Sequence, residues 1–597
     1  MSDPYILAVS ARALPGSVMG SAQATTLLEL KVQDPPLQAV DHAKGVLATQ
    51  LPRWIKQVDL GAHSTDEAPA GVATLALLSD LIQAVQLEAG IAVAKSLPVQ
   101  LTALKGVDAT LFLPSQHYKA TEIAINWACE VLNALLTGVF DFDLIAALDK
   151  AHHRLKPFAE QGVNNFFILQ ASYALGVPVF RPVQGLLVLG TGCRSRWLKS
   201  LISEETPMLG MQFAQGKHVT AALLHAAGLP GGIHHLVTTR EQAMEAAEVL
   251  GYPVVVKPAD ADRGAGVAAG LTYPLSVALA YDTAVKVSLN VLVERWAAGH
   301  THRLTVQDGR VIRVVRRIAG GVVGDGVHMV GELVGLFQQT PRQQRFARRL
   351  GYQPLSLDDE AIELLGERGL TVQSRPEKGA YIKLRRRDNV NAGGTNEELA
   401  PDDAFVVHPD NVRLAIEAAR VLRLDIAGID LITTDIAQSW LEVGALICEV
   451  NACPQMGGTN DPGLYQRVLA RMFPNGAKIP AELLVVPAHP HEQERIKDRL
   501  LRECGGVAVS LASGLWIDGT RSTPAFKHSF DAAQSLLQRG EVQHAICCMT
   551  ANDIHYFGLP LQKWDAVRVV ADAMFTHEEA ELLVSIRDWL PEPVPRA

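Results

Sequence analysis

Residues 425–458 place acidic and amide side chains in and after two apolar segments, which constrains the fold more than any other feature of this 597-residue chain. The segments AGIDLI and ALICEV are rich in aliphatic residues, so we expect neighbouring strands. Asp430 lies in the first, and Glu449 and Asn451 lie at the end of the second. A buried carboxylate needs a cation, and oxygen ligands suit Mg²⁺ better than zinc. The stretch predicts a magnesium-nucleotide site, although a structural role fits any one of these residues about as well.

Length and composition limit the class of protein. A chain of this length predicts roughly three or four domains. The net charge of -9 argues against a general nucleic-acid binder. The seven cysteines lack the paired spacing of a zinc site and suit a reducing compartment. We find no apolar run of about 18 residues and no basic leader, so we expect a cytoplasmic protein that does not enter a membrane.

Hydrophobic periodicity predicts an α/β and α+β multidomain fold. Residues 1–160 mix strands and helices in a small α+β domain, and residues 161–480 form a larger central domain that begins with a separate segment at 161–210. Residues 481–597 alternate strands and helices, as in a compact α/β domain with parallel strands. Within the central domain we expect a helix capped by Thr239 and a hairpin that turns at Asp308 and Gly309.

Two lysines precede the acidic stretch and are candidates for phosphate binding. Lys257 directly follows the apolar run VVV, where a charge is costly, and Lys217 lies at the start of a helical pattern. Gly264 and Gly266 would let the loop after Lys257 approach phosphates closely. Considered alone, Lys217 fits a solvated helix residue better than a ligand-binding one.

The order of these parts resembles the ATP-grasp fold: a helix lysine, a strand lysine with a glycine loop, the segment VLVERW, and then Asp, Glu and Asn on closing strands. Seven motifs together resemble the central domain of the cyanophycin synthetase family over roughly residues 160–480. They are GYPVVVKP, GHTHRLTV, VVGDGVHMVGELV, KLRRRDNVNAGGT, FVVHPDN, LRLDIAGIDLI and ICEVNACPQM. SARALPGSVMGS and YKATEIAINWACEVLNALL are similar, less closely, to that family's N-terminal domain.

The resemblance implies an ATP- and Mg²⁺-dependent ligase. Such an enzyme phosphorylates the carboxylate of a growing cyanophycin-like peptide, and the amine of aspartate or of a β-Asp-Arg dipeptide then attacks the acyl phosphate. The resemblance also implies a homodimer or homotetramer. By matched motif, Lys217, Lys257, Gly264 and Gly266 would hold phosphates, Glu294 would hold adenosine, and Asp430, Glu449 and Asn451 would hold magnesium. Arg303, Arg385 and Asn389 would face phosphates or the acyl phosphate; the run at Arg385 alone fits a solvated strand edge about equally.

Three segments depart from the family pattern. Residues 260–267 read DADRGAGV where the family usually has DGNHGRGV, so Arg263 replaces a histidine and could clamp phosphate but not act as an acid or base. Residues 488–494 read AHPHEQE in place of the phosphate loop GTNGKTT of a Mur-ligase-like domain. Residues 76–80 read ALLSD where some relatives carry HxxEH. We therefore expect a truncated Mur-ligase-like domain at 481–597 that lacks its own ATP site.

Three interpretations follow. The first is a shortened synthetase with one working ligase site, most similar to the second type in this family, which polymerises ready-made β-Asp-Arg dipeptides. The second is a catalytically silent paralogue that acts as a structural or regulatory partner of a full-length synthetase. A ligase for another short peptide is a third.

Overall fold

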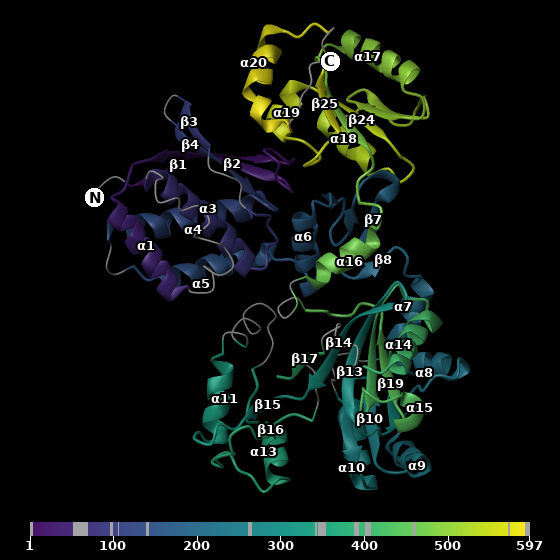
Figure 1. Cartoon of the computed structure of the whole chain (residues 1–597). Coiled ribbons are helices and arrows are strands. Elements are labelled where there is room, and N and C mark those ends of the chain that lie inside the picture. The colour runs from purple at the N-terminus through teal and green to yellow at the C-terminus, as the bar shows by residue number, and fades with distance from the viewer. Residues whose placement is uncertain are drawn as a thin grey trace. The chain divides into compact units, whose positions relative to one another are not determined.

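The structure is a computed structural model that divides into two compact units (Figure 1). It describes residues 4–51, 70–95, 100–104, 107–138, 142–260, 266–340, 343, 354–386, 393–399, 407–457, 461, 463–570 and 573–591. Unit 1 comprises Met1–Ser200 with Gly457–Ala597, and unit 2 comprises Leu201–Met456. The predicted boundaries 1–160, 161–480 and 481–597 remain a prediction.

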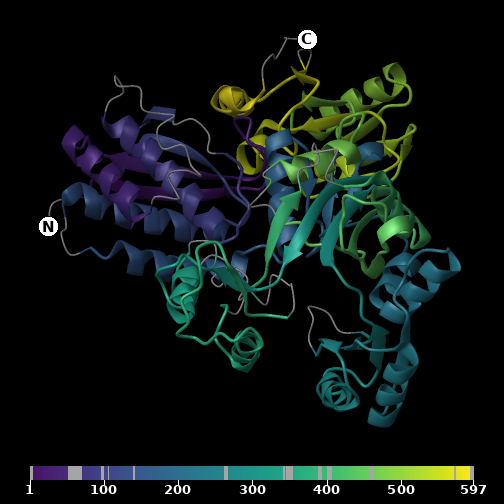
Figure 2. The same ribbon diagram turned by 60° about the horizontal axis from the view of Figure 1, so that its bottom comes forward.

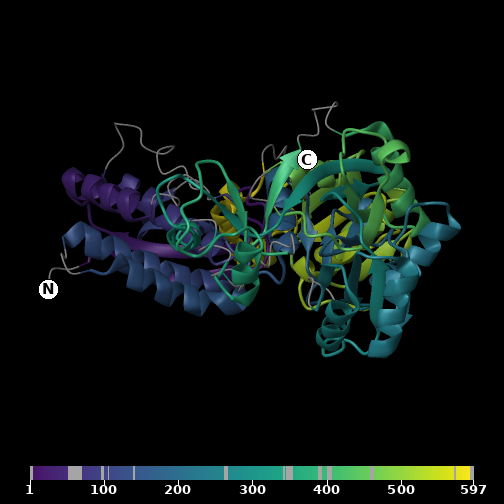
Figure 3. The ribbon, with the colours of Figure 1, turned by 90° about the horizontal axis from the view of Figure 1, so that it is seen from below.

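The N-terminal part of unit 1 is a sheet covered by helices. The strands have the order β1-β2-β4-β3, with β1 (Ile6–Leu14), β2 (Thr25–Val32), β3 (Gln100–Leu104) and β4 (Val107–Pro114). Helices α1 (Leu37–Gln50), α3 (Ala70–Glu88), α4 (Tyr118–Thr137) and α5 (Leu144–Leu155) supply most of the core and run alongside the sheet (Figure 3). By length and composition α3 could cross a membrane, but most of it is buried in this core, and it contains the ALLSD segment.

The rest of unit 1 holds a six-stranded sheet of order β23-β22-β21-β24-β20-β25. The strands β20 (Ala481–Val485), β21 (Ala508–Leu511), β24 (Ala545–Met549) and β25 (Ala566–Val569) are parallel, as predicted, and β22 (Gly514–Ile517) and β23 (Thr520–Arg521) are antiparallel. Its helices are α17 (Pro490–Glu503), α18 (Ser529–Leu537), α19 (Ala551–Phe557) and α20 (His577–Ser585). A small antiparallel group, β5 (Val179–Phe180), β6 (Leu187–Leu189) and β7 (Arg196–Lys199), accompanies α6 (Val163–Leu175) and α16 (Leu464–Met472).

The loop after β1 docks against the segment after α19. Gly16 N donates to Phe557 O at 2.6 Å, and Ser17 N donates to Leu559 O at 2.6 Å. A Cβ at Gly16 would lie 2.5 Å from Leu559 O, so only glycine permits this close approach. The motif SARALPGSVMGS thus joins the two ends of the chain within unit 1.

Unit 2 contains three lobes, each with its own hydrophobic core (Figures 1 and 2). One is the sheet β11-β10-β12-β9 with its two helices: β9 (His234–Val237), α9 (Arg240–Leu250), β10 (Val254–Pro258), β11 (Ala268–Leu271), α10 (Pro274–Ala284) and β12 (Val291–Arg295). A second, smaller lobe comprises β15 (Gly321–Val323), α11 (Val330–Gln338), α13 (Asp359–Gly366) and β16 (Tyr381–Lys383).

The third lobe is a five-stranded antiparallel sheet of order β17-β14-β13-β18-β19. Its strands are β13 (His300–Gln307), β14 (Arg310–Ile318), β17 (Thr395–Leu399), β18 (Ile426–Thr433) and β19 (Leu446–Asn451). The accompanying elements are β8 (Ile202–Ser203), α7 (Met208–Gln215), α8 (Lys217–Ala226), α14 (Pro409–Val421) and α15 (Trp440–Val443).

The sequence predicted several of these strands, turns and helix ends correctly. The two segments of the acidic stretch are neighbouring strands, β18 and β19. The hairpin of β13 and β14 turns where expected, with left-handed φ values of 47° at Asp308 and 65° at Gly309. Thr239 caps α9 by accepting a hydrogen bond from Gln242 N at 3.2 Å.

Candidate active site

The five-stranded sheet has one apolar and one charged face. Leu304, Ile429 and Val450 belong to a core that also contains residues of α7, α8 and α14. Because side chains alternate along a strand, Arg303 and Asp430 point to the opposite face. They are also direct partners in the register of β13 and β18. This charged face is the candidate active site.

Asp430 is the most buried acidic group on that face, with 2% of its surface exposed. Arg303 donates two hydrogen bonds to its carboxylate, from Nη2 to Oδ2 at 2.7 Å and from Nε to Oδ1. Arg317 Nη2 lies 3.1 Å from the same Oδ2. Burial alone would raise the pKa of the Asp430 carboxyl, but the charges of Arg303 and Arg317 outweigh it and lower that pKa. Asp430 is therefore held as a carboxylate between two guanidinium groups.

A bulge in β19 brings Glu449 beside Asp430. Asp430 pairs with Glu449 while Leu431 pairs with Ile447, so Cys448 is an extra residue in the strand. The bulge leaves Cys448 and Glu449 both partly exposed between the buried Ile447 and the buried Val450.

Asn451, the remaining candidate metal ligand, lies two residues after Glu449 on the same strand. Asn451 pairs with Gly428, one pleat along from Asp430, and its Nδ2 lies 3.4 Å from Gly428 O. Lys217 Nζ is 4.0 Å from Glu449 Oε1, so a helix lysine also reaches this face. The structure thus brings the three predicted metal ligands to one face and adds a predicted phosphate lysine.

The strand lysine of the neighbouring lobe forms a buried ion pair. Lys257 on β10 bonds to Glu294 on β12, and their side chains are 9% and 6% exposed. Burial lowers the pKa of Lys257, but the Glu294 carboxylate raises it more, so the pKa is above its ordinary value. The Glu449 carboxylate also raises the pKa of Lys257, so charges on β10 and β19 interact. Glu294, which the resemblance assigns to adenosine, here neutralises this lysine.

Arg385 lies in different surroundings from those expected of a phosphate ligand. Its Nη1 and Nη2 each lie 2.9 Å from the Asp358 carboxylate, and Nη2 also donates to Ser356 O at 3.1 Å. The guanidinium therefore binds Asp358, whose carboxylate caps the start of α13 in the smaller lobe by accepting from Ala361 N. The contacts the structure gives for Arg385 include none to Arg303 or Asp430.

Three predicted residues, Arg263, Gly264 and Asn389, lie outside the described residues. Gly266 is described and has a left-handed φ of 70°. A Cβ there would lie 3.1 Å from the ring of Pro258, so this end of the loop packs tightly after β10.

Two arginines of β14 that the motifs did not predict also lie on this charged face. Arg317 contacts Asp430 as described, and Arg313 bonds to Glu398 and to the carbonyl oxygen of Met456. Their spacing of four residues along a strand puts both on one face. That spacing in RVIRVVRRI, read after the predicted turn, was the signal available for them.

The donor set fits magnesium. Among the described residues, no three His, Cys, Asp or Glu side chains gather as a metal site, so the amide of Asn451 would have to complete any set built on Asp430 and Glu449. All three supply oxygen, the ligand that Mg²⁺ prefers. Arg303 and Arg317 would share the Asp430 carboxylate with the ion.

The segment after β20, where the sequence lacks a phosphate loop, is bonded to a buried carboxylate. Ala488 N, after β20, donates to Glu579 Oε1 at 2.6 Å, and Glu579 is buried. His489 and His491 are exposed. A buried carboxylate at this position repels a nucleotide phosphate.

Comparison with known proteins identifies the central part of the chain. Residues 379–463 match the RimK-like ATP-grasp domain. The cyanophycin synthetase of Nostoc sp. (strain PCC 7120 / SAG 25.82 / UTEX 2576) is 33% identical over 327 residues, which cover 53% of this chain and 36% of that protein. The glutathione biosynthesis bifunctional protein GshAB of Streptococcus agalactiae serotype V is 29% identical over 272 residues, which cover 43% of this chain and 35% of that protein.

A solved bifunctional glutathione synthetase from Pasteurella multocida is similar with a TM-score of 0.39 and 21% identity, covering 61% of this chain and 52% of that one. The match with the Nostoc protein spans about a third of that relative's length. The resemblance seen in the motifs is confirmed over part of the chain: about half of its length is similar to cyanophycin synthetases, and residues 379–463 match the RimK-like ATP-grasp domain.

Proposed function

We propose that the chain is an ATP-dependent peptide ligase that adds aspartate or β-Asp-Arg units to a cyanophycin-like peptide. The observation that carries this proposal is the register of β13, β18 and β19, which aligns Arg303, Asp430, Glu449 and Asn451 on one face. The relatives named cyanophycin synthetase support the substrate class.

In the proposed reaction, a carboxylate oxygen of the peptide attacks the γ-phosphorus of ATP, and ADP leaves. The amine nitrogen of the incoming unit then attacks the carbonyl carbon. The bond from that carbon to the phosphate oxygen breaks, inorganic phosphate leaves, and the amine loses a proton as the amide forms. Activation replaces a poor leaving group by a good one.

The chain's own residues would act by charge and position. Arg303 and Arg317 would neutralise charge that develops on the transferring phosphoryl group, and Lys217 and Lys257 would hold phosphates. Magnesium bound by Asp430, Glu449 and Asn451 would neutralise phosphate oxygens. To bind the adenosine end of ATP, the Glu294 carboxylate would have to divide its hydrogen bonds between the nucleotide and Lys257, or release Lys257.

The second candidate is a catalytically silent partner of a full-length synthetase. Two observations favour it: the altered loop at residues 260–267, and the Asp430 carboxylate whose two oxygens are both bonded to arginine. A homodimer or homotetramer is compatible with both candidates.

The test is ADP release by the purified full chain supplied with ATP, Mg²⁺ and a primer peptide. Aspartate, arginine and β-Asp-Arg are added singly and together, each with and without primer. The ligase proposal expects ADP release and a lengthened primer with one of these amines. Failure of every substrate set, together with tight binding to a full-length synthetase, would select the silent partner instead.

A further inference from the structure

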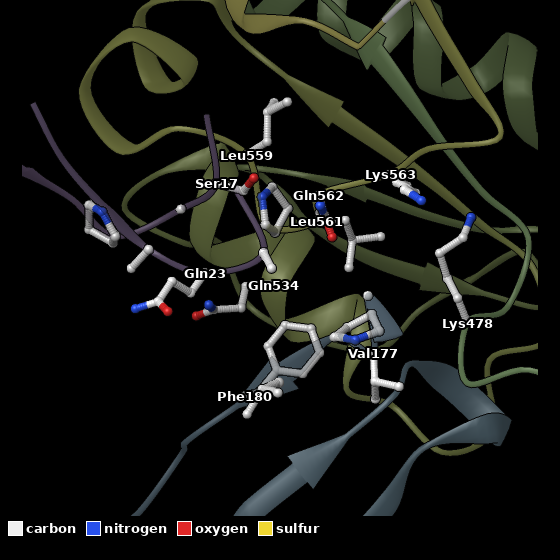
Figure 4. Close-up of a pocket in the computed structure, with 18 residues that line it drawn as sticks. Ser17, Gln23, Val177, Phe180, Lys478, Gln534, Leu559, Leu561, Gln562 and Lys563 are labelled. Carbon is white, nitrogen blue, oxygen red and sulfur yellow. The ribbon is translucent and has the colours of Figure 1, made fainter. Parts of the chain in front are cut away.

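The cavity of unit 1 is part of the junction between the two ends of the chain. It has a volume of about 140 Å³ and lies between the loop after β1 and the segment that precedes β25 (Figure 4). Two of its lining residues, Ser17 and Leu559, pair with each other through their backbones. The buried side chains of Phe180 and Leu561 are also part of its wall. These contacts give the cavity a structural role in unit 1, whereas the candidate active site lies in unit 2.

The candidate active site is bounded on one side by the segment that follows β19. This segment, residues 453–456, is named the crossing segment because of its course over the sheet. Cys453 is partly exposed and Gln455 is exposed, whereas Pro454 and Met456 are buried. The crossing segment therefore has one side packed on the protein and one side open to solvent.

Four residues from four neighbouring strands form one row across the charged face. Asn451 on β19 pairs with Gly428 on β18. Gly428 in turn pairs with Thr305 on β13, which pairs with Arg313 on β14. Because residues directly opposite each other in a sheet share a face, the row lies one pleat from Asp430 on the same face.

Two contacts show that the crossing segment follows this row. A Cβ at Gly428 would lie 2.8 Å from Pro454 Cβ, so Pro454 packs directly on β18. Two residues later, the carbonyl oxygen of Met456 accepts a hydrogen bond from Arg313 Nη1, so the chain has reached β14. Thr305, which lies between these two contacts, is 1% exposed. The crossing segment therefore passes from β19 over β18 and β13 to β14 and covers this row of the charged face.

Arg313 anchors the far end of the crossing segment. Its side chain is 8% exposed, and it binds Glu398 on β17 through Nε, at 3.1 Å from Oε2, and through Nη2 to Oε1. These two bonds fix the plane of the guanidinium and direct Nη1 at the carbonyl oxygen of Met456. A single buried arginine thus joins β17, β14 and the segment that follows the candidate metal ligands.

The proposed reaction needs a fixed wall because its intermediate also reacts with water. When a water oxygen attacks the carbonyl carbon of the acyl phosphate, inorganic phosphate leaves and the peptide carboxylate is regenerated. ATP is then consumed without formation of an amide. Closed active sites prevent such side reactions by excluding water. A segment held over the sheet beside Asp430 closes that side of the site.

We propose that Arg313 is a positioning residue, which holds the crossing segment over the sheet and thereby keeps water from the acyl phosphate. The exclusion of water rests on the proposed ligase function, whereas the anchoring of the segment does not. Arg313 acts through Met456 and not by contact with the reacting atoms.

Alkylation of Cys453 in the full chain without ATP tests the anchoring. N-ethylmaleimide is the reagent, and peptide mass spectrometry follows Cys453 together with the exposed Cys193 of unit 1 as an internal reference. Arg313→Met raises the rate at Cys453 about tenfold, the usual effect of losing one charge-assisted hydrogen bond, and leaves the rate at Cys193 unchanged. Arg313→Lys keeps a charged donor and recovers most of the wild-type rate. The matched change Arg310→Met, at an exposed arginine of the same strand, changes neither rate.

The ratio of ADP released to amide formed tests the exclusion of water. With ATP, Mg²⁺, primer and the amine that lengthens it, the wild type forms an amide for each ADP. Arg313→Met raises the ratio several-fold, and Arg313→Lys restores it. Pro454→Gly, which loosens the same segment without altering a charge, also raises the ratio. A variant that is only less folded loses both products in proportion, so its ratio stays that of the wild type.

Equal alkylation of Cys453 in the wild type and in Arg313→Met overturns the proposal whatever the ligase activity is. In an active enzyme, a ratio of ADP to amide that stays unchanged in both Arg313→Met and Pro454→Gly overturns it as well. A chain without ligase activity refutes the proposed function and the exclusion of water with it, and alkylation then decides whether Arg313 anchors the crossing segment.

Discussion

Single buried charges dominate the energetics of the candidate site. The charges of Lys257 and Glu294 neutralise each other between two strands. The charges of Arg303 and Arg317 neutralise that of Asp430. Removing one partner of such a pair leaves a charge in a poorly solvated place, which costs far more than the pair itself contributes.

Lys257→Met should therefore lower the free energy of unfolding by roughly 3–5 kcal/mol, because Glu294 is left buried and unpaired. Urea unfolding measures this loss. The double change Lys257→Met with Glu294→Leu should recover most of it, and Lys286→Met, at an exposed lysine, should change little. A double variant as unstable as the single one would show that the pair is not the cause.

His302 makes stability depend on pH. Burial lowers its pKa to about 4, and the charges of Arg316 and His300 add to this, against Asp435 and a hydrogen bond to the His300 backbone. An unfolded histidine takes up its proton near pH 6.5, so lowering the pH from about 6.5 to 4 favours the unfolded chain.

Because of this, His302→Gln should flatten the acid side of the stability curve, where wild-type stability falls by roughly 2 kcal/mol from this residue. Above pH 6.5 the slopes should match. Urea midpoints at several pH values measure the difference, with His42→Gln at an exposed position as the control. An unchanged slope in His302→Gln would contradict the assignment.

Strands β18 and β19 hold the side chains of the candidate active site in place. Gly428 on β18 lies under Arg303 and Pro454, and a Cβ there would stand 2.9 Å from Arg303 Nη1 and 2.8 Å from Pro454 Cβ. The close packing holds the arginine against Asp430.

Gly428→Val should displace Arg303 and reduce ATP turnover at least tenfold, since the charge on the transferring phosphoryl group loses its counter-ion. Initial rates of ADP release at saturating ATP give the measurement. The control is Gly335→Ala in helix α11, where a Cβ meets nothing within 4 Å and alanine favours the helix. Wild-type turnover in Gly428→Val would argue against this role of Arg303.

The strands could be predicted because apolar runs and turn residues determine the conformation of nearby residues, as at the turn of Asp308 and Gly309. The sequence also selected Asp430, Glu449 and Asn451, because a carboxylate in an apolar run is costly. It could not predict the bulge at Cys448, which depends on the pairing of β18 with β19. Nor could it find that Arg385 bonds to Asp358, since that contact spans 27 residues and depends on how the smaller lobe folds.

The whole chain divides into two compact units, so its thermal unfolding should show two transitions. ATP with Mg²⁺ should raise the midpoint of one transition only, that of unit 2, because a ligand stabilises the part that binds it. Differential scanning calorimetry measures both. A variant of unit 1 such as Leu536→Ala, at a fully buried site, should lower the other transition alone. Two transitions that ATP raises equally would contradict a nucleotide site confined to unit 2.

Ligation at the charged face of β13, β18 and β19 is the proposed activity of the whole chain. It is tested most directly by ATP-dependent lengthening of a cyanophycin-like primer in wild type, Glu449→Gln and the exposed control Glu442→Gln. Wild type and Glu442→Gln should lengthen the primer and release ADP, and Glu449→Gln should do neither while remaining folded. Lengthening by Glu449→Gln at the wild-type rate would contradict it.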